Sequence, residues 1–213
     1  MNPAEQSRRT AEICALAPVV PVLVVPDPGQ AEGLARALVA GGLPALEVTL
    51  RTPAALEAIR AMADVPGGVV GAGTLLTPED VRAAKAAGAA FGVSPGATDR
   101  LLNAAEEMGL PLLPGAASAS EVMRLLERGY TVQKFFPAEA AGGAPALAAI
   151  GAPLPQVTFC PTGGITPALA PDYLKLANVA CVGGSWVAPK DAVAAGDWDR
   201  VTKLAAEAAA LVP

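Results

Sequence analysis

The sequence predicts an α/β fold, a (β/α)8 TIM barrel preceded by an N-terminal helix, in a single domain that spans residues 1–213. Short apolar runs typical of buried parallel strands alternate with helical patterns eight times, and the connections between them are short. Eight such units in 213 residues favour a closed barrel over an open, doubly wound sheet. The open sheet would usually carry an early Gly-x-Gly-x-x-Gly turn, whereas the first predicted strand here is followed by Pro26-Asp27-Pro28-Gly29.

The predicted elements follow one another regularly along the chain. Strands are predicted where apolar and β-branched residues run together. Their ranges are 19–25, 45–50, 68–72, 90–93, 110–113, 130–137, 156–159 and 179–182. Helices are predicted where apolar residues recur at helical spacing. Their ranges are 3–16, 30–40, 54–62, 79–87, 99–108, 120–128, 145–150, 167–176 and the segment that leads toward Val212.

Glycine and proline mark the boundaries of several elements. Gly41-Gly42, Gly88, Gly109 and Gly129 each follow a predicted helix, which is where glycine commonly ends one. Pro78 opens a helix, a position that tolerates proline because its missing N–H would be unpaired there anyway. The boundaries are therefore consistent with the strand–helix alternation.

Composition excludes several classes of protein. A chain with 53% hydrophobic and 16% charged residues is globular, and a net charge of −5 with mixed signs provides no basic stripe for nucleic acid. The longest apolar run, 15–25, is too short to span a bilayer and contains two prolines, so no membrane association is expected. Three widely spaced cysteines and the lack of a signal peptide indicate a reducing compartment and a cytoplasmic location.

The sequence contains no histidine. Ser-His-Asp and Cys-His nucleophile systems are therefore excluded, as is an imidazole general base. Histidine-based zinc sites are excluded as well, and we expect no metal site. Any proton transfer must use a carboxylate, lysine, tyrosine, cysteine or water.

One predicted strand carries a lysine among apolar residues. Lys134 has Val132, Phe135 and Phe136 as close neighbours in the sequence. Burial disfavours the charged ammonium and leaves more of the free amine, which is the form that attacks a carbonyl to make a Schiff base. The alternative is a lysine at the end of a strand whose ammonium reaches water.

The second predicted strand places polar residues on one face. Because side chains alternate along a strand, Glu47, Thr49 and Arg51 share the face opposite to the apolar residues, and we expect this polar face to line the barrel. Charged groups in a barrel are costly unless they are paired or used. A structural Glu47–Arg51 ion pair is the alternative to a catalytic role.

Glycine-rich turns follow the last strands. Pro161-Thr162-Gly163-Gly164-Ile165 follows the seventh strand and Gly183-Gly184-Ser185 is expected to follow the eighth. In (β/α)8 enzymes these two loops commonly bind a phosphate through backbone N–H groups, and Ser185 adds a hydroxyl donor. The alternative is a pair of tight turns.

Together these motifs resemble the 2-keto-3-deoxy-6-phosphogluconate (KDPG) aldolase family, whose members often also act on 4-hydroxy-2-oxoglutarate (KHG). The resemblance covers nearly the whole chain, with the motifs in the family's order. They are Leu46-Glu-Val-Thr-Leu-Arg51, Gly71-Ala-Gly-Thr74, Ser94-Pro-Gly96, Lys134-Phe-Phe-Pro-Ala-Glu139, Phe159-Cys-Pro-Thr-Gly-Gly164 and Gly183-Gly-Ser-Trp186.

The resemblance implies a role for individual residues. Lys134 would be the Schiff-base lysine and Glu47 the general acid/base. Four residues would bind the pyruvate part of the substrate: Arg51, Thr74, Pro95 and Phe136. Six would form the phosphate site: Thr162, Gly163, Gly164, Gly183, Gly184 and Ser185. The resemblance also implies a homotrimer and a reaction without a cofactor or metal.

The function expected from this resemblance is that of a class I aldolase. It would cleave KDPG to pyruvate and glyceraldehyde 3-phosphate, and also KHG to pyruvate and glyoxylate, so its partners are small phosphorylated keto acids and pyruvate. Two alternatives keep the barrel. One is a phosphosugar epimerase or isomerase in which Lys134 is a base without a covalent adduct. The other is a non-catalytic phosphosugar-binding barrel in which Glu47, Arg51 and Lys134 form a buried ion cluster.

Overall fold

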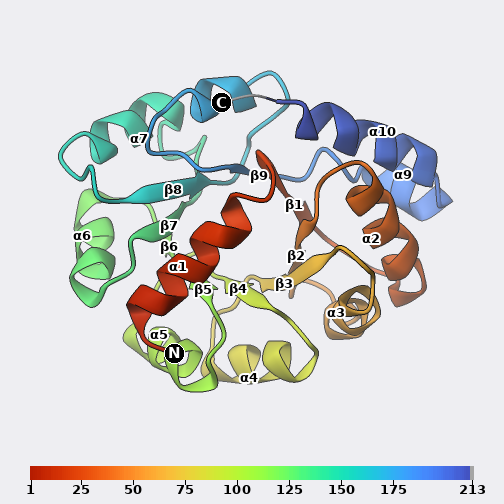
Figure 1. Cartoon of the computed structure of the whole chain (residues 1–213), viewed down its shortest axis with the longest axis horizontal. Coiled ribbons are helices and arrows are strands. Elements are labelled where there is room, and N and C mark those ends of the chain that lie inside the picture. Colours follow the sequence, from red (N-terminus) through yellow and green to blue (C-terminus); the bar gives the residue numbers. More distant parts are fainter. Residues whose placement is uncertain (212–213) are drawn as a thin grey trace.

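In the computed structural model, which describes residues 1–211, parallel strands form a ring surrounded by helices (Figure 1). The strands are β1 (Val19–Leu23), β2 (Ala45–Thr49), β3 (Val69–Gly73), β4 (Phe91–Val93), β5 (Leu112–Leu113), β6 (Gly115–Ala116), β7 (Val132–Phe135), β8 (Thr158–Pro161) and β9 (Val182–Gly184). The helices are α1 (Pro3–Cys14), the 3-10 turn η1 (Pro28–Gln30), α2 (Ala31–Ala40), α3 (Ala55–Ala63), α4 (Pro78–Ala86), α5 (Asp99–Met108), α6 (Ala119–Arg128), α7 (Gly143–Gly151), α8 (Ala170–Leu174), α9 (Lys190–Ala195) and α10 (Trp198–Ala209).

The strand order closes into an eight-membered ring. One sheet runs β5-β4-β3-β2-β1-β9 and the other β6-β7-β8, with parallel pairing throughout. Only Pro114 separates β5 from β6, so the two pieces form one barrel strand, and the Lys134 N–H donates to the Pro114 carbonyl at 2.8 Å. Isolated bridges Phe159↔Val179 and Thr162↔Gly183 join β8 to the segment of β9. The predicted (β/α)8 barrel with an N-terminal helix is confirmed.

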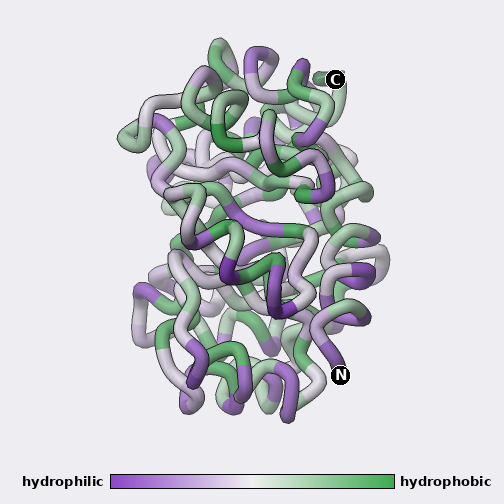
Figure 2. Tube along the Cα trace, turned by 90° about the vertical axis from the view of Figure 1, so that its left-hand side faces the viewer, coloured by the Kyte–Doolittle hydropathy of each residue, from purple (hydrophilic) through white to green (hydrophobic). Residues whose placement is uncertain are grey.

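Alternating side chains divide the core into two layers. Leu46 and Val48 of β2 point outward and pack in the large cluster between the strands and the helices. A smaller cluster fills the inside of the ring below Glu47, and it contains Val20, Phe91 and Val93. In Figure 2 many of the hydrophilic residues lie on outer turns of the chain. The interior of the ring is thus a packed core, as expected for a barrel of eight strands.

The three cysteines meet in this inner layer. Cys14, Cys160 and Cys181 come from α1, β8 and the segment before β9, and all three are buried, free thiols of the smaller cluster. Their wide spacing in the sequence concealed this proximity, which the closure of the ring produces.

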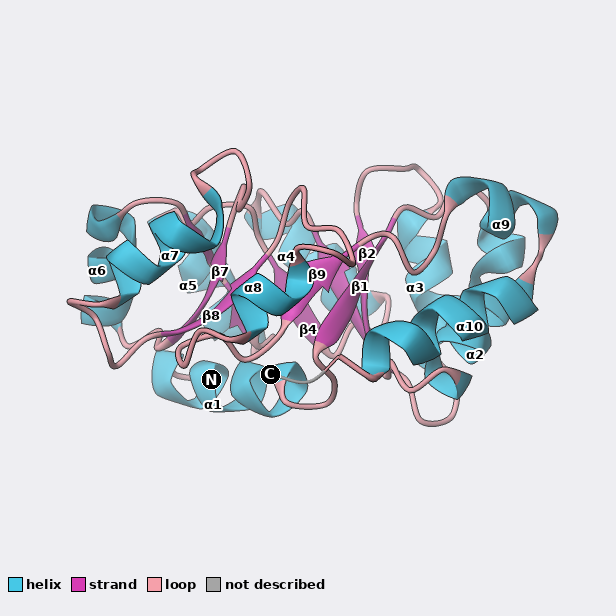
Figure 3. Ribbon diagram, turned by 90° about the horizontal axis from the view of Figure 1, so that it is seen from above, coloured by secondary structure: helices cyan, strands magenta, loops and turns pink. Residues whose placement is uncertain are grey.

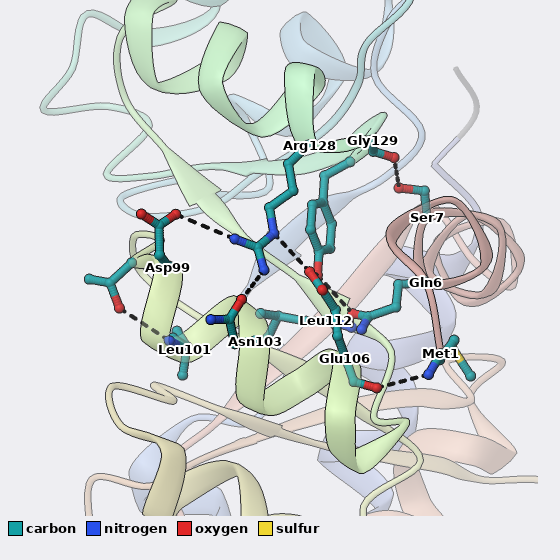
Figure 4. Close-up of polar contacts among 12 residues, drawn as sticks. Met1, Gln6, Ser7, Asp99, Leu101, Asn103, Glu106, Leu112, Arg128 and Gly129 are labelled. Atoms are coloured by element: carbon teal, nitrogen blue, oxygen red, sulfur yellow. Dashed lines mark hydrogen bonds and ion pairs between the residues drawn. The ribbon is translucent and has the colours of Figure 1, made fainter.

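Helix α1 crosses one end of the ring and lies beneath the strands in Figure 3. It starts in a capping box, because Asn2 accepts from the Glu5 N–H while the Glu5 carboxylate accepts from the Asn2 N–H. Its buried face then bonds to the barrel. The Gln6 side-chain oxygen accepts from the Leu112 N–H at 2.9 Å and from the Tyr130 hydroxyl at 3.3 Å (Figure 4). The end of the barrel opposite to the predicted active site is therefore closed by α1.

A second polar network joins α5 to α6 beside this contact. The Arg128 guanidinium donates to Glu106 at 2.8 Å, to Asn103, and to Asp99 at 3.4 Å (Figure 4). The single proton of the Tyr130 hydroxyl is shared between the Gln6 oxygen and the Glu106 carboxylate, which lies 3.1 Å away. Burial, with the Glu106 carboxylate nearby, raises the pKa of Tyr130 above its ordinary value. These bonds tie two outer helices and α1 to one side of the barrel.

Some predicted boundaries differ from those observed. The strand predicted at 179–182 lies instead at Val182–Gly184, so Gly183 and Gly184 are strand residues rather than a loop after the strand. Glycine is disfavoured in strands, but here tertiary packing overrides that preference, as the site geometry below explains. The predicted helix at 167–176 is confined to Ala170–Leu174. The last helix ends at Ala209, and Val212 lies outside the described residues.

Within residues 1–211, no helix has both the length and the apolar character needed to cross a membrane.

Candidate active site

The barrel brings Lys134 and Glu47 together. Lys134 lies in β7 and Glu47 in β2, 87 residues apart in the sequence, and the lysine Nζ donates to Glu47 Oε1 at 3.2 Å. Their side chains are only 6% and 4% exposed. A lysine that reaches bulk water, the alternative considered from the sequence, is therefore not what the structure contains. The amine faces a carboxylate inside the barrel and the Phe136 ring, whereas Phe135 points outward into the large cluster.

Burial determines the acid–base character of Glu47. Loss of hydration raises the pKa of the Glu47 carboxyl above its ordinary value of 4.5, while the Lys134 ammonium opposes this rise and Cys160 adds to it. Cys160 of β8 is the register partner of Lys134 in β7. A carboxyl group whose pKa is raised in this way can exchange protons closer to neutral pH than an exposed glutamate does.

Gly73 makes room for the Glu47 carboxylate. It ends β3 and pairs with Thr49 of β2. A Cβ at residue 73 would lie 2.3 Å from Glu47 Oε1, so the Glu47 side chain would have to move. Gly73 belongs to a motif recognised in the sequence, but its role depends on a contact across strands that no local pattern reveals.

Of two further predicted residues, Phe136 borders the amine and Pro95 lies against the neighbouring strand β6. The ring centroid of Phe136 is 5.3 Å from Lys134 Nζ, within the range of a cation–π contact. Phe136 is half-buried and so presents part of its ring at the mouth of the barrel. Pro95 is also half-buried and follows β4, where its carbonyl carbon would be 2.3 Å from a Cβ at Gly115. The glycine allows the loop after β4 to lie directly over β6.

Thr74 and Arg51 follow neighbouring strands. Among the described non-glycine residues, Thr74 alone has a positive φ, 62°, immediately after β3. Such a conformation costs about 1–3 kcal/mol and concentrates at ligand sites. Arg51 lies two residues beyond β2 and is exposed, without a carboxylate within 4 Å in the described part of the chain. The Glu47–Arg51 ion pair and the three-residue buried cluster, both alternatives from the sequence, are therefore absent from residues 1–211.

Not all of the predicted inward-facing polar residues act in the same way. Thr49 is buried and its hydroxyl donates to the Leu23 carbonyl at 2.8 Å, a bond between neighbouring strands. Thr49 thus has a structural contact, whereas the Arg51 guanidinium remains available at the rim.

The predicted phosphate loop has two parts. Gly163 and Gly164 follow β8 with φ values of 108° and 79°, which favour glycine. The bridge between Thr162 and Gly183 brings this loop beside β9, and Ser185 follows β9 directly as an exposed residue. The structure therefore gathers the two glycine motifs and the serine at the same end of the barrel as Arg51 and Thr74.

The glycines of β9 have a packing role that the sequence did not indicate. A Cβ at Gly183 would lie 2.2 Å from Thr162 Oγ1, and one at Gly184 would lie 2.1 Å from the Trp186 ring. These glycines let β8 and Trp186 approach the strand closely. They are residues of the strand itself and not of a loop after it, which corrects the expectation from the sequence.

Glu139 supports the predicted phosphate loop from the side of α8. Its N–H donates to the Gly163 carbonyl at 3.0 Å, and its carboxylate accepts from the Tyr173 hydroxyl of α8. Burial, together with Glu139, raises the pKa of Tyr173 and keeps its hydroxyl protonated as the donor. Glu139 ends one of the recognised motifs but was given no role, because its partner Tyr173 is distant in the sequence.

The described residues contain no group of three or more cysteine, aspartate or glutamate side chains arranged to hold a metal ion.

Comparison with known proteins agrees with this geometry. The KHG/KDPG aldolase of Escherichia coli (strain K12) is 56% identical over 192 residues, which are 90% of this chain and 90% of that protein. The 2-keto-3-deoxy-6-phosphogluconate aldolase of Zymomonas mobilis ZM4, solved with 3-phosphoglycerate, superposes with a TM-score of 0.92 at 51% identity and covers 96% of this chain and 97% of its own.

A third relative bears on the chemistry of the family. The KDPG aldolase of Legionella pneumophila, solved with pyruvate captured at low pH as a covalent carbinolamine intermediate, has a TM-score of 0.91 at 47% identity, covering 94% of this chain and 98% of its own. The model of the KDPG and KHG aldolase family matches residues 10–204. The chain therefore belongs to the KDPG and KHG aldolase family.

Proposed function

We propose that this protein is a class I aldolase that cleaves KDPG to pyruvate and glyceraldehyde 3-phosphate, and also KHG to pyruvate and glyoxylate. The observation that carries the proposal is the buried contact of 3.2 Å between Lys134 Nζ and Glu47 Oε1. The name of the Escherichia coli relative, which includes both substrates, and the pyruvate carbinolamine in the Legionella relative support it.

In the proposed reaction the neutral amine of Lys134 attacks the C2 carbonyl carbon of the keto acid. The resulting carbinolamine loses water and becomes an iminium ion. When the C3–C4 bond breaks, its electron pair moves toward the iminium nitrogen and forms an enamine, so no free carbanion is needed. A lysine on a strand with a side chain that is only 6% exposed suits this chemistry because its nitrogen is held in place.

Glu47 is the general base and then the general acid of the proposed reaction. Its carboxylate accepts the proton of the C4 hydroxyl as the aldehyde leaves, and it then delivers a proton to C3 of the pyruvate enamine. Water hydrolyses the new iminium and releases pyruvate and the free Lys134 amine. The contact between Glu47 and Lys134 supports this role, because a carboxylate next to the lysine nitrogen would lie near the carbons that react.

The remaining predicted site residues bind the two ends of the substrate. Arg51 and Thr74 hold the carboxylate of the pyruvate part, for which a guanidinium is suited because it donates two parallel hydrogen bonds. Pro95 and Phe136 pack against the carbon chain. The phosphate binds at the other side of the barrel mouth, to the group formed by Thr162, Gly163, Gly164, Gly183, Gly184 and Ser185.

Trapping of the Schiff base tests this function. Incubation with pyruvate and sodium borohydride should increase the intact mass of the protein by one reduced pyruvate adduct, and peptide mapping should locate it on Lys134. The Lys134→Arg variant keeps the positive charge but cannot form the adduct. An epimerase, an isomerase or a binding protein that uses Lys134 only electrostatically would show no adduct, and this result would refute the proposal.

We also propose that the protein is a cytoplasmic homotrimer. A content of 53% hydrophobic residues is high for a chain of 213 residues and supports additional burial between subunits. Light scattering after size-exclusion chromatography should give three times the chain mass of 21.2 kDa. A mass of one chain would refute the trimer and leave the aldolase proposal intact.

A further inference from the structure

A cavity of about 580 Å³ lies at the mouth of the barrel next to the predicted phosphate loop. Ser185 forms part of its wall, and so do Val22 and Val24 near the end of β1. Val20, two residues before Val22, belongs to the cluster inside the ring, so the alternation along β1 places Val22 and Val24 above that cluster on the same inner face. The cavity therefore opens beside the mouth of the barrel at Ser185 and extends between η1 and α9.

Lys190, the first residue of α9, is the one charged residue lining this cavity within the described chain. The other lining residues are apolar apart from Gln30 and Ser185. The Gln30 amide is already bonded to the Ala194 carbonyl at 3.3 Å, which ties the chain after β1 to α9. The cavity thus has mostly apolar walls and one positive charge, that of Lys190.

The Lys190 ammonium has no carboxylate partner within 4 Å in the described residues. Its neighbour Asp191 does not neutralise it, because the Asp191 carboxylate is paired with Arg200 at 2.7 Å. Lys190 is exposed, so its side chain can turn toward a ligand without breaking an ion pair. The positive charge at this side of the mouth is therefore available for an anion.

The phosphate site itself lacks a cation. Its predicted members are glycine N–H groups and the hydroxyls of Thr162 and Ser185, all neutral, whereas a phosphate monoester carries a charge of about −1.5 to −2 at neutral pH. The protein as a whole, at −5, repels such a substrate. A cleft that has apolar walls and one sign of charge focuses the field and attracts the opposite ion. Lys190 meets this requirement at the position next to Ser185.

We propose that Lys190 determines the preference for phosphorylated substrates, by attracting the phosphoryl end of the substrate into the cavity between β1, Ser185 and α9. This inference rests on the proposed aldolase function and names a residue that the recognised motifs do not contain. Lys190 acts on binding of the phosphorylated end and takes no part in the chemistry at Lys134, which lies deeper in the barrel.

The test compares two substrates that differ only in the phosphate, KDPG and 2-keto-3-deoxygluconate. In Lys190→Gln, KM for KDPG should rise roughly 5- to 20-fold, with kcat changed by less than about twofold. The kinetic constants for 2-keto-3-deoxygluconate should stay the same. Lys190→Arg should restore a low KM for KDPG, and raising the salt from about 10 mM to about 200 mM should reduce the difference between wild type and Lys190→Gln.

Lys203→Gln is the matched control, because Lys203 is an exposed lysine of α10 that does not line the cavity. It should leave both substrates unaffected. An equal change for the two substrates in Lys190→Gln, or none for either, would overturn the inference. The same change in Lys203→Gln would do so as well, since it would reveal a general effect of net charge.

Two measurements separate this inference from the function on which it rests. Borohydride trapping of pyruvate on wild type and Lys190→Gln reports the chemistry at Lys134 alone and should be equal in both. Calorimetric titration with inorganic phosphate reports the anion site without turnover, and Kd should be higher in Lys190→Gln. Trapping in both proteins with an unchanged Kd for phosphate would refute the role of Lys190 and leave the aldolase intact. A changed Kd without trapping would refute the aldolase and keep the anion site.

Discussion

Lys134 Nζ and Glu47 Oε1 lie 3.2 Å apart although 87 residues separate them in the chain. The pair is buried, and breaking such a pair by removing one partner leaves the other charge in a poorly hydrated place. A protein gains little net stability from a buried ion pair, so the presence of this pair inside the barrel, within β2 and β7, favours a catalytic use. The predictions below begin from this contact.

Glu47→Gln separates proton transfer from imine formation. The amide keeps the size of the side chain but cannot accept a proton, so we expect turnover of KDPG to fall by roughly 10²–10⁴-fold. Borohydride trapping of pyruvate should persist, because Lys134 remains. If trapping and turnover are lost together, Glu47 instead maintains the position or the protonation of the lysine.

The pH dependence of proton exchange should reveal the raised pKa of Glu47. Burial raises this pKa above 4.5, so the carboxylate loses its basic form at a higher pH than an exposed glutamate would. At saturating pyruvate in D₂O, the exchange rate of the methyl protons measured by NMR should fall as the pH decreases through a midpoint above 4.5. That decrease should vanish in Glu47→Gln. An identical profile in both proteins would assign it to another group.

Gly73→Ala should displace the carboxylate without altering any charge. The added Cβ would lie 2.3 Å from Glu47 Oε1, so the Glu47 side chain must move and its contact with Lys134 Nζ should be lost. A shift of about 1 Å near reacting groups lowers the rate by about 100-fold, and steady-state kinetics should show that scale of loss.

Gly109→Ala is the control for this change. Gly109 ends α5 at φ 61°, where the added Cβ has no neighbour within 4 Å, so the cost is about 1–2 kcal/mol of backbone strain. The free energy of unfolding of this variant, measured with urea, should be lower than that of wild type, but its specific activity should be unchanged. Similar activity in Gly73→Ala and Gly109→Ala would contradict the role of Gly73.

Gln6→Ala tests the attachment of α1 to the barrel. The substitution leaves the buried Leu112 N–H without its acceptor and removes a partner of the Tyr130 hydroxyl (Figure 4). We expect the free energy of unfolding, measured with urea, to fall by about 1–3 kcal/mol. Arg9→Ala is the comparison on the same helix, since Arg9 forms only an exposed pair with Glu12 and should cost less than about 1 kcal/mol. Equal losses in the two variants would show that the Gln6 bonds contribute no more than a surface pair.

Much of the fold could be predicted because it depends on local patterns. Buried parallel strands are continuous apolar runs and their helices show periodic apolar faces, so the alternation identified the barrel. The exception at β9 has a clear cause. Gly183 and Gly184 are poor strand formers, and only the contacts with Thr162 and Trp186 explain why they lie in the strand.

The residues of the candidate site could be predicted, but the contacts between them could not. Lys134 was recognisable because a lysine within an apolar strand is unusual, and Glu47 because it lies on the inner face of its strand. The partner of Glu47 remained open between Arg51 and Lys134. The structure pairs Glu47 with Lys134 and leaves Arg51 exposed at the rim.

The sequence by itself determined the order of strands and helices, the inward face of the second strand, and the residue types available for chemistry in a chain without histidine. The tertiary structure decided which of these residues meet: Lys134 with Glu47, Gly73 with the Glu47 carboxylate, the three cysteines with one another, and Lys190 with the cavity beside Ser185. The physical reason is the range of the forces involved. Hydrophobic periodicity reflects the local conformation of near neighbours in the chain. These contacts, in contrast, arise only when the ring of strands closes, because the register between strands then sets the position of each side chain along the barrel axis.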